Sequence, residues 1–306
     1  MPIILITGGA GNIGSRLASL LAKKSDYKIV ILDNLSTGVK THIPQLPNVT
    51  FIKANVNDYN DIVAVFGRYN FDYVFHFAAV VGVKRTLEHP IAVLEDLEGI
   101  KHILSLSKNT GVKRVFYSSS SEVYGEPFEV PQHENTTPLN SRLPYAIVKN
   151  AGEAFCKAYR NEFDLSYTIF RFFNTYGPQQ SDDFVVPRFL KSALKGEPIT
   201  IHGDGLQTRS FCYIDDTVET CIKTLEGELY INDVLNIGND KEMTILDLAQ
   251  TIIKVAQSDS KIIHLPALEE GDMRRRCPDT TKMKQVLNRD LTALEQGLQN
   301  MIQGLG

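Results

Sequence analysis

The sequence is poor in the features that define several large classes of protein. It has no excess of positive charge: 32 lysines and arginines are set against 36 aspartates and glutamates, which leaves a formal net charge of −4. This balance argues against nucleic acid as the main partner. The chain contains no run of eighteen apolar residues, and glycines interrupt the apolar N-terminus at Gly8 and Gly9. We therefore expect neither a membrane span nor a signal peptide, but a strand at the N-terminus.

Cysteine is scarce as well. The chain has four cysteines, and they show no metal-type pairing: Cys156, Cys212, Cys221 and Cys277. We expect free, buried thiols, no metal site and a cytoplasmic location. What the chain does have is length and apolar content, because 306 residues of which 43% are hydrophobic suffice for one large or two smaller globular domains.

Short apolar segments alternate with segments of helical periodicity along the first half of the chain. The apolar segments cover residues 4–7, 28–33, 49–52, 73–79, 114–118 and 165–173. This alternation predicts an α/β fold with a doubly wound parallel sheet of the Rossmann type. The segments that follow are mixed, so we expect a dinucleotide-binding domain over residues 1–173 and a smaller mixed α/β substrate domain over 174–306, with some segments interleaved.

A glycine-rich turn follows the first apolar segment. Gly8, Gly11 and Gly14 lead from this segment into a helical segment, and we expect Asn12 and Ile13 among them to contact the cofactor as well. Glycines at these positions allow a tight turn, close approach of a pyrophosphate and packing of the helix on the strand, and the first N–H groups of the helix face the phosphates. The motif predicts a dinucleotide, and a purely structural turn is the alternative.

Asp33 ends the second apolar segment. An acid at this place accepts hydrogen bonds from an adenosine ribose and repels a 2′-phosphate, which favours NAD over NADP. A solvated turn residue or helix cap is the alternative. Because right-handed crossovers bring the carboxyl ends of parallel strands to one edge, we expect Asn55, Ala78, Ala79 and Ser118 to Ser121 to converge near the glycine turn.

Tyr145 and Lys149 are four residues apart in a helical segment that begins with Pro144, so their side chains share one face. A lysine ammonium beside a phenol favours the phenolate, which predicts a lowered pKa for Tyr145 and a base usable near neutral pH. A hydroxyl from Ser119 or Ser120 could share the proton. Surface neighbours without a function are the alternative.

Together these motifs resemble the extended short-chain dehydrogenase/reductase family. The resemblance covers nearly the whole chain and is carried by Gly8-x-x-Gly11-x-x-Gly14, residues 33–36, 76–79 and 118–125, Tyr145-x-x-x-Lys149 and residues 171–174. The members that this chain resembles most are NAD-dependent nucleotide-sugar epimerases, dehydratases and decarboxylases. In these enzymes a serine, a tyrosine and a lysine help to remove a hydride and a proton from the sugar C4, and a retained NADH later returns the hydride.

The resemblance implies roles for single residues. Ser120, with Ser119 before it, matches the hydroxyl of the triad, Tyr145 the base, and Lys149 the residue that holds the nicotinamide ribose. Asn55 replaces an acid that the family usually places near the adenine. The further cofactor contacts implied in this way are Asn34, Ser36, Val56, Phe77, Ala78, Ala79, Ser118 and Phe173.

The second half of the chain resembles the nucleotide-sugar side of the family. The segment 203–209 looks like a diphosphate loop that ends in Arg209, and Arg274 to Arg276 occupy another phosphate-reading segment. A guanidinium fork suits diphosphate oxygens. The alternative for part of the run from Arg274 to Arg276 is that these side chains are simply exposed to solvent. The resemblance implies a UDP-sugar that contacts Asn174, Val186, Arg209, Arg274 and Arg276.

Two features bear on the reaction. Glu122 resembles the glutamate of 4,6-dehydratases and UDP-glucuronate decarboxylases, where a carboxylate exchanges a proton at C5, but Ser121 replaces the acid that the dehydratases carry. The segment 80–83 resembles the matching segment of epimerase-type relatives. Glu269, by contrast, stands where galactose-type epimerases carry an arginine.

We predict a UDP-sugar 4-epimerase that keeps its NAD. Decarboxylation of UDP-glucuronate or 4,6-dehydration is the alternative, and a non-catalytic NAD sensor is a remote one. The resemblance also implies a homodimer that pairs through the helices beginning near Pro90 and Pro144.

Overall fold

The computed structural model describes residues 1–126, 128–266 and 275–304. Its centre is a seven-stranded sheet in the order β11-β6-β5-β4-β1-β2-β3, with every neighbouring pair parallel. The predicted Rossmann-type fold is confirmed. The strands are β1 (Ile3–Thr7), β2 (Lys28–Asp33), β3 (Val49–Lys53), β4 (Tyr73–His76), β5 (Arg114–Ser120), β6 (Ser166–Phe172) and β11 (Asp233–Ile237).

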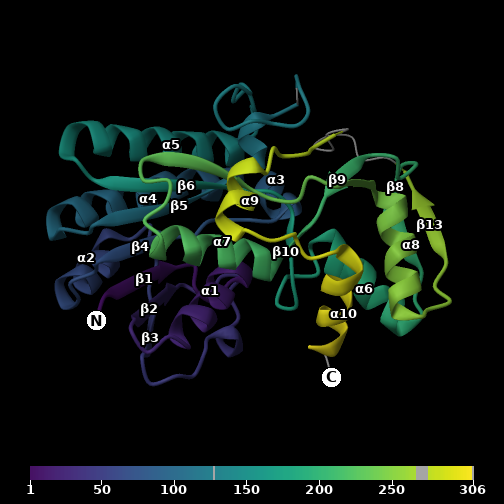
Figure 1. Ribbon diagram of the computed structural model, residues 1–306, viewed down its shortest axis with the longest axis horizontal. Helices are drawn as coiled ribbons and strands as arrows, with labels where there is room; N and C mark the ends of the chain where they lie inside the picture. The colour runs from purple at the N-terminus through teal and green to yellow at the C-terminus, as the bar shows by residue number, and fades with distance from the viewer. Residues whose placement is uncertain (127, 267–274, 305–306) are drawn as a thin grey trace.

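Helices cover both faces of the sheet, as Figure 1 shows with α5 on one side and α1 and α7 on the other. The helices of one face are α2 (Tyr59–Arg68), α4 (Pro90–Thr110) and α5 (Pro144–Phe163), and those of the other are α1 (Asn12–Ala22) and α7 (Ile214–Glu226). Successive residues of a strand point to opposite faces. Within β1, Ile4 and Ile6 therefore join the core that contains α1 and α7, and Leu5 joins the core that contains α2 and α4.

The second part of the chain forms shorter elements beside the sheet (Figure 1). Its helices are α6 (Val185–Lys195), α8 (Ile245–Ala256), α9 (Thr281–Leu287) and α10 (Leu294–Gln303). Its strands form three pairs: β7 (Thr175–Tyr176) with β10 (Cys212–Tyr213), β8 (Ile199–His202) with β13 (Ile262–Leu265), and β9 (Thr208–Ser210) with β12 (Glu242–Thr244). The remaining elements are α3 (Val83–Glu88) and the 3₁₀ turns η1 (Lys40–His42) and η2 (Ser121–Tyr124).

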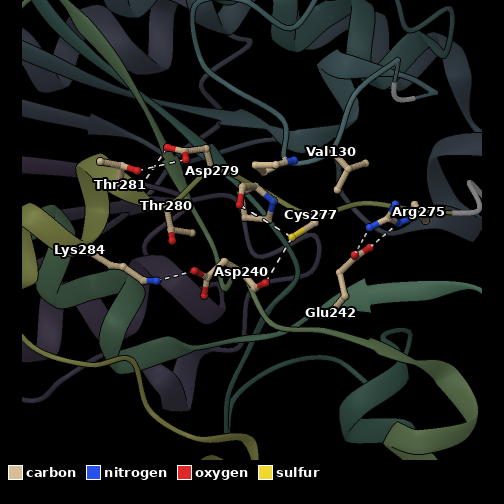
Figure 2. Close-up of a pocket in the computed structure, with 11 residues that line it drawn as sticks. Val130, Asp240, Glu242, Arg275, Cys277, Asp279, Thr280, Thr281 and Lys284 are labelled. Carbon is tan, nitrogen blue, oxygen red and sulfur yellow. Dashed lines mark hydrogen bonds and ion pairs between the residues drawn. The ribbon is translucent and has the colours of Figure 1, made fainter.

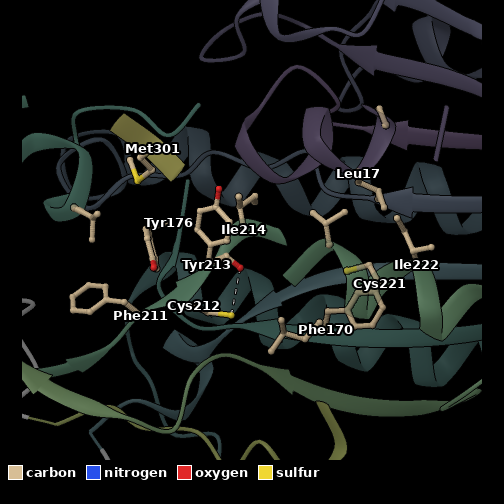
Figure 3. Packing of buried hydrophobic residues seen from close by; sticks show 14 of the residues in the cluster. Leu17, Phe170, Tyr176, Phe211, Cys212, Tyr213, Ile214, Cys221, Ile222 and Met301 are labelled. Atoms are coloured by element: carbon tan, nitrogen blue, oxygen red, sulfur yellow. Dashed lines mark hydrogen bonds between the residues drawn. The ribbon is translucent and has the colours of Figure 1, made fainter. Parts of the chain in front are cut away.

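The two parts share one hydrophobic core. Figure 3 shows Leu17 of α1 and Met301 of α10 in the same packed cluster, with Phe170 and Tyr213 among the residues around them. The boundary near residue 174 is therefore not a clean division between two cores.

Strand β11 is an interleaved segment. The sequence analysis placed it among the mixed elements of the second part, but β11 pairs with β6 at the edge of the main sheet, with Val234 opposite Ile169 and Leu235 opposite Phe170. A short apolar strand carries no information about its partner, so its place in the sheet could not be predicted from its composition.

The four cysteines are free and buried, as predicted. In the part of the chain that the structure describes, no helix combines the length and the apolar character that crossing a bilayer requires.

Candidate active site

The glycine-rich turn joins β1 to α1 and has a backbone that other residues would not fit. Gly8 has φ +67°, and a Cβ there would lie 2.7 Å from the backbone nitrogen of Ala78. A Cβ on Gly14 would lie 2.4 Å from the carbonyl oxygen of Gly8. Gly11 is the N-cap of α1, with no side-chain cap and no acidic residue in the first turn. The first N–H groups of α1 therefore suit an anion such as a dinucleotide pyrophosphate.

Asp33 ends β2 beside this turn and is 8% exposed. Its Oδ2 accepts a hydrogen bond from the Ala10 nitrogen at 3.0 Å, and its Oδ1 accepts one from the Leu35 nitrogen at 2.8 Å. These bonds orient the carboxylate and leave lone pairs for the hydroxyls of a ribose. In the exposed loop that follows, the Oδ1 of Asn34 accepts a bond from the backbone nitrogen of Ser36 at 2.9 Å.

Thr7 links the glycine turn to the loop after β4. Its hydroxyl accepts bonds from the backbone nitrogens of Phe77 and Ala78 at 3.1 and 3.2 Å, and it lies 2.8 Å from Nδ1 of His76. Burial and the charge of Lys149 lower the pKa of His76 to about 3. The neutral imidazole can therefore accept the proton of the Thr7 hydroxyl.

The other expected cofactor contacts lie in the loops after β3 and β4. Asn55 is partly exposed, and its Oδ1 accepts a bond from the Asn57 backbone nitrogen at 3.1 Å. Val56 is buried, while Phe77 and Ala79 are partly exposed. Both loops follow the carboxyl ends of strands in one parallel sheet and therefore lie along the same edge of it.

Helix α5 begins at Pro144 and carries Tyr145 and Lys149 one turn apart, as predicted. The Lys149 ammonium donates to the Ser118 carbonyl oxygen at 2.7 Å and to its hydroxyl at 3.3 Å. It lies 5.7 Å from the centre of the Tyr145 ring. Burial lowers the pKa of Lys149 to about 8, and the charge of Asp96 opposes this change.

The pKa of Tyr145 differs from the prediction. Desolvation by burial raises it well above the usual phenol value, and a side-chain hydrogen bond with Ser120 offsets only part of this increase. The charge of Glu122 raises it further. The expectation of a lowered pKa for Tyr145 is therefore wrong for this geometry, because desolvation of the buried phenol is the largest cause.

Ser119 and Ser120 have different partners. The Ser119 hydroxyl donates to Oε1 of Glu153 at 2.5 Å, and both residues are almost completely buried. The Ser120 hydroxyl accepts a bond from the Glu122 nitrogen at 3.2 Å and is hydrogen-bonded to Tyr145. Neighbouring residues of a strand face opposite ways. This corrects the expected set: Ser120 lies beside Tyr145, whereas Ser119 belongs to the buried network of Glu153.

Arg276 and Glu122 form an ion pair next to Tyr145. The Nη1 of Arg276 lies 2.8 Å from Oε1 of Glu122, and the two side chains are 7% and 22% exposed. The same nitrogen is 3.4 Å from the Ser121 hydroxyl. The charges of both partners act on the pKa of Tyr145, Glu122 raising it and Arg276 lowering it. Arg276, for which a diphosphate contact stays a prediction, brings a guanidinium to the candidate catalytic residues.

The other expected substrate contacts lie in the second part of the chain. Arg209 is on β9, partly buried, and its Nη1 donates to the Thr208 carbonyl oxygen at 2.7 Å. The Asn174 amide donates to the Ser210 carbonyl oxygen at 3.1 Å. Val186 is 2% exposed and packs in the core, so its side chain does not line an open site. Arg274 and Glu269 lie outside the described residues.

Phe173 also differs from its expected position. Its side chain has no exposed surface and packs in a small cluster with Val123 and Tyr124. Its backbone nitrogen donates to the carbonyl oxygen of Ile237 in β11 at 2.8 Å. The ring therefore belongs to the core in this structure and does not flank an open nicotinamide position.

A separate surface pocket of about 300 Å³ is lined by Arg275 and Cys277, the two neighbours of Arg276 in the chain, among other residues (Figure 2). Two ion pairs line it, Arg275 with Glu242 and Lys284 with Asp240. The thiol that lies between these pairs belongs to Cys277, and burial raises its pKa to about 11 (Figure 2). Charges that are already paired and a protonated thiol give this pocket no evident chemistry.

Some residues of the site escaped the sequence analysis. Three of them are buried polar residues: Thr7, Asp96 and Glu153. Thr7 and Glu153 are hydrogen-bonded to expected site residues, and the charge of Asp96 acts on the pKa of Lys149. Asp96 left a signal in the sequence, because it is an acid on the apolar face of a helix that also carries Val93 and Ile100. Buried acids of this kind are rare without a partner.

Comparison with known proteins identifies the family. Residues 4–238 match the model of the NAD dependent epimerase/dehydratase family. The chain belongs to this family. Its cofactor is NAD, as the residues around Gly8 and Asp33 predicted, and the resemblance found in the sequence is confirmed.

Three relatives illustrate the range within the family. A UDP-N-acetyl-alpha-D-glucosaminuronate decarboxylase of Bacillus cytotoxicus is 37% identical, over 98% of this chain and 96% of its own. UDP-glucuronic acid decarboxylase 4 of Arabidopsis thaliana is 34% identical, over 98% of this chain and 67% of its own. The crystal structure of a UDP-glucose 4-epimerase from Thermotoga maritima with UDP-glucose has a TM-score of 0.93 and 31% identity, over 99% of this chain and 98% of its own. The chain is thus an NAD-dependent family enzyme with both decarboxylases and epimerases among its relatives.

Proposed function

We propose that this enzyme decarboxylates a UDP-hexuronic acid. The observation that carries the proposal is the guanidinium of Arg276 beside Glu122 and Tyr145, with an Nη1 to Oε1 distance of 2.8 Å. A guanidinium presents a fork of N–H donors that matches a carboxylate. A substrate carboxylate at the sugar C6 can compete with Glu122 for this fork. The decarboxylase relatives support this reading over the 4-epimerase that the sequence analysis placed first.

The proposed reaction needs a change of redox state at C4 and a proton at C5. NAD held by the glycine turn and Asp33 would supply the oxidation at C4 and the matching reduction at the end. With a ketone at C4, the C6 carboxylate is β to a carbonyl, so the bond between C5 and C6 breaks, carbon dioxide leaves and its electron pair passes into an enolate. A proton added at C5 restores the ketone. The net change is the loss of carbon dioxide and the gain of one proton.

Named side chains would perform the proton steps. Tyr145, hydrogen-bonded to Ser120, would take the proton of the 4-hydroxyl, and Lys149 would hold the ribose beside it. Glu122, once displaced from Arg276, would deliver the proton to C5. The high pKa of the Tyr145 phenol means that the base needs a further positive charge nearby before it works at neutral pH.

The nucleotide would lie against the second part of the chain. Arg209 lies in β9, and Asn174 lies just after β6. Both side chains carry N–H donors that suit a diphosphate. Arg274 as a second diphosphate contact stays a prediction from the sequence. The NAD is proposed to remain bound through turnover, since the hydride that is removed must return to the same sugar.

The test is a product analysis. The enzyme is incubated separately with UDP-glucuronate, UDP-N-acetylglucosaminuronate, UDP-glucose and UDP-N-acetylglucosamine, and the sugars are identified by proton NMR. We expect one of the two uronates to lose C6 and give a UDP-pentose. An inverted C4 in a sugar with all its carbons would support the 4-epimerase, which the structural similarity to the Thermotoga maritima enzyme favours.

We also propose a homodimer that pairs through α4 and α5. The apolar side chains of Ile91 and Leu94 on α4 and Ile147 on α5 are exposed, and these two helices pack side by side. Sedimentation velocity is expected to give twice the mass of the chain, and charged substitutions at Ile91 and Ile147 are expected to give monomers.

A further inference from the structure

The inner face of α4 holds the loop between β3 and α2. Three residues of this helix, spaced three positions apart, face the loop: Asp96, Gly99 and His102. The Asp96 carboxylate accepts a bond from Nδ2 of Asn57 at 3.2 Å, and His102 Nδ1 is 3.1 Å from the carbonyl oxygen of Val56. Between them lies Gly99, where a Cβ would be 2.4 Å from Oδ1 of Asn57. The helix and the loop are therefore in close contact.

Asp96 also holds a second loop. Its other oxygen, Oδ2, accepts a bond from the backbone nitrogen of Val80 at 2.7 Å. Val80 continues the loop after β4 that carries Ala78 and Ala79, and Asn57 continues the loop that carries Asn55. One carboxylate thus ties together the two loops that are expected to contact the dinucleotide.

The charge of the Asp96 carboxylate acts on the ammonium of Lys149. Asp96 is 7% exposed, and burial raises its pKa. The titratable groups on which its charge acts lie on β5 and α5, and Glu95 of its own helix acts on it in turn. His76 of β4 is neutral because burial lowers its pKa to about 3, and burial keeps Tyr117 of β5 protonated. On α5 its field acts on the phenol of Tyr145, whose pKa it raises, and on the ammonium of Lys149.

We propose that Asp96 is a positioning residue with two separable tasks: its two oxygens hold the cofactor loops together, and its negative charge acts on the side chain of Lys149. The second task rests on the proposed catalytic role of Lys149. A neutral residue with the same shape would perform the first task and fail in the second. Loss of one loop contact at unchanged charge would do the opposite.

The variants separate the two tasks. D96N keeps an oxygen for Val80 and can pair with a reoriented Asn57 amide, but it removes the charge. N57A removes one loop contact and keeps the charge, and D96A removes both. E98Q removes the same charge from an exposed position of the same helix and serves as the control.

Two readouts need no sugar substrate. The first is the NAD content of the purified protein, measured after denaturation. The second is the titration of Lys149 in the holoprotein, followed by NMR of lysine labelled with ¹³C at Cε and assigned by loss of the signal in K149R. Because neither depends on turnover, the absence of decarboxylation would overturn the proposed function and leave this test intact.

D96N is expected to keep its NAD and its melting temperature, while the pKa of Lys149 falls by about half a unit or more. In N57A the NAD content of the purified protein is expected to fall about threefold or more, while the pKa of Lys149 stays unchanged. D96A should show both effects, and E98Q neither. If the pKa of Lys149 in D96N equals that in wild type, the charge role is overturned. If N57A and D96A keep their full NAD content, the loop role is overturned.

Where turnover is present, its pH profile adds a third readout. If Lys149 acts as an ammonium, kcat/KM falls as the pH rises through the pKa of this residue. In D96N this fall is expected at lower pH, by the same shift as in the NMR titration. An unshifted profile beside a shifted titration would show that the charge of Lys149 does not limit catalysis.

Discussion

Two pairs of glutamate and arginine lie near β5, and they differ in how completely they are enclosed. Arg171 and Glu153 form two bonds, from Nε at 2.8 Å and from Nη2 at 2.7 Å, with side chains 2% and 1% exposed. Arg171 also donates to the Tyr124 hydroxyl at 2.8 Å. In the other pair, Nη1 of Arg276 lies 2.8 Å from Oε1 of Glu122, and the Glu122 side chain is 22% exposed.

The difference separates a structural pair from a reactive one. Arg171 and Glu153 join β6 to α5 within the main sheet, and their network includes Ser119. Arg276 arrives from the C-terminal segment to meet η2, so this pair joins the two parts of the chain beside Tyr145. The same two residue types thus hold the fold in one place, and in the other they form the pair that is proposed to exchange partners with a carboxylate substrate.

The largest effect is expected from opening the enclosed pair. R171M leaves the Glu153 carboxylate buried without its cation and should lower the free energy of unfolding by about 3–5 kcal/mol. Urea denaturation measures this loss. R160M is the matched control, because Arg160 and Asp164 form an exposed pair whose loss should cost about 0.5 kcal/mol or less. Equal effects in the two variants would remove the distinction between an enclosed and a surface pair.

The second pair should act on catalysis instead. R276M is expected to lower kcat/KM for the uronate by about 10²- to 10³-fold, since it removes the cation that receives the carboxylate. Its free energy of unfolding should fall by less than that of R171M. The adjacent R275M, which loses an exposed pair with Glu242, should change kcat/KM by less than about twofold. Activity in R276M close to that of wild type would contradict the assigned role of this arginine.

The smallest expected effect concerns Lys149, a buried cation bound to neutral oxygens. Burial lowers its pKa to about 8, whereas the unfolded chain keeps the usual value of 10.5. Above pH 8 the unfolded state therefore binds more protons than the native state, and the stability contributed by this group rises with pH. By contrast, burial lowers the pKa of Arg171 but the bond and charge of Glu153 raise it more, so that it stays above its usual value.

A comparison of wild type with K149M measures this contribution. The free energy of unfolding of wild type, relative to that of K149M, should rise by about 2–3 kcal/mol between pH 7 and pH 10 in protein freed of cofactor. K191M is the control, because Lys191 is exposed and paired with Asp182. A difference that stays constant over this range would show that burial does not lower the pKa of Lys149.

The sequence predicted the elements of the fold well because their signals are local. The glycine turn, the apolar segments and the helix that begins at Pro144 are each defined by residues within a few positions of one another. The place of β11 in the sheet depends on a partner more than sixty residues away in the chain, Thr168 to Asp233 being the first pair of its register, and no local pattern encodes such a pairing.

The site was harder to predict than the fold for the same reason. The choice between Ser119 and Ser120 depends on which face of β5 meets Glu153, and the partner of Arg276 is 154 positions away in the chain. The pKa of Tyr145 depends on burial, which a helical spacing to Lys149 does not report. Motifs indicated which residues matter, and only the packing showed what each one contacts.

The central claim is that the Arg276 and Glu122 pair opens to a C6 carboxylate that then leaves. The most direct measurement uses UDP-glucuronate or UDP-N-acetylglucosaminuronate labelled with ¹³C at C6, with wild-type enzyme followed by carbon NMR. The account predicts that the label moves from the sugar into carbon dioxide and bicarbonate with wild type, and much more slowly with R276M. Label that stays in a UDP-sugar with an inverted C4 would contradict it.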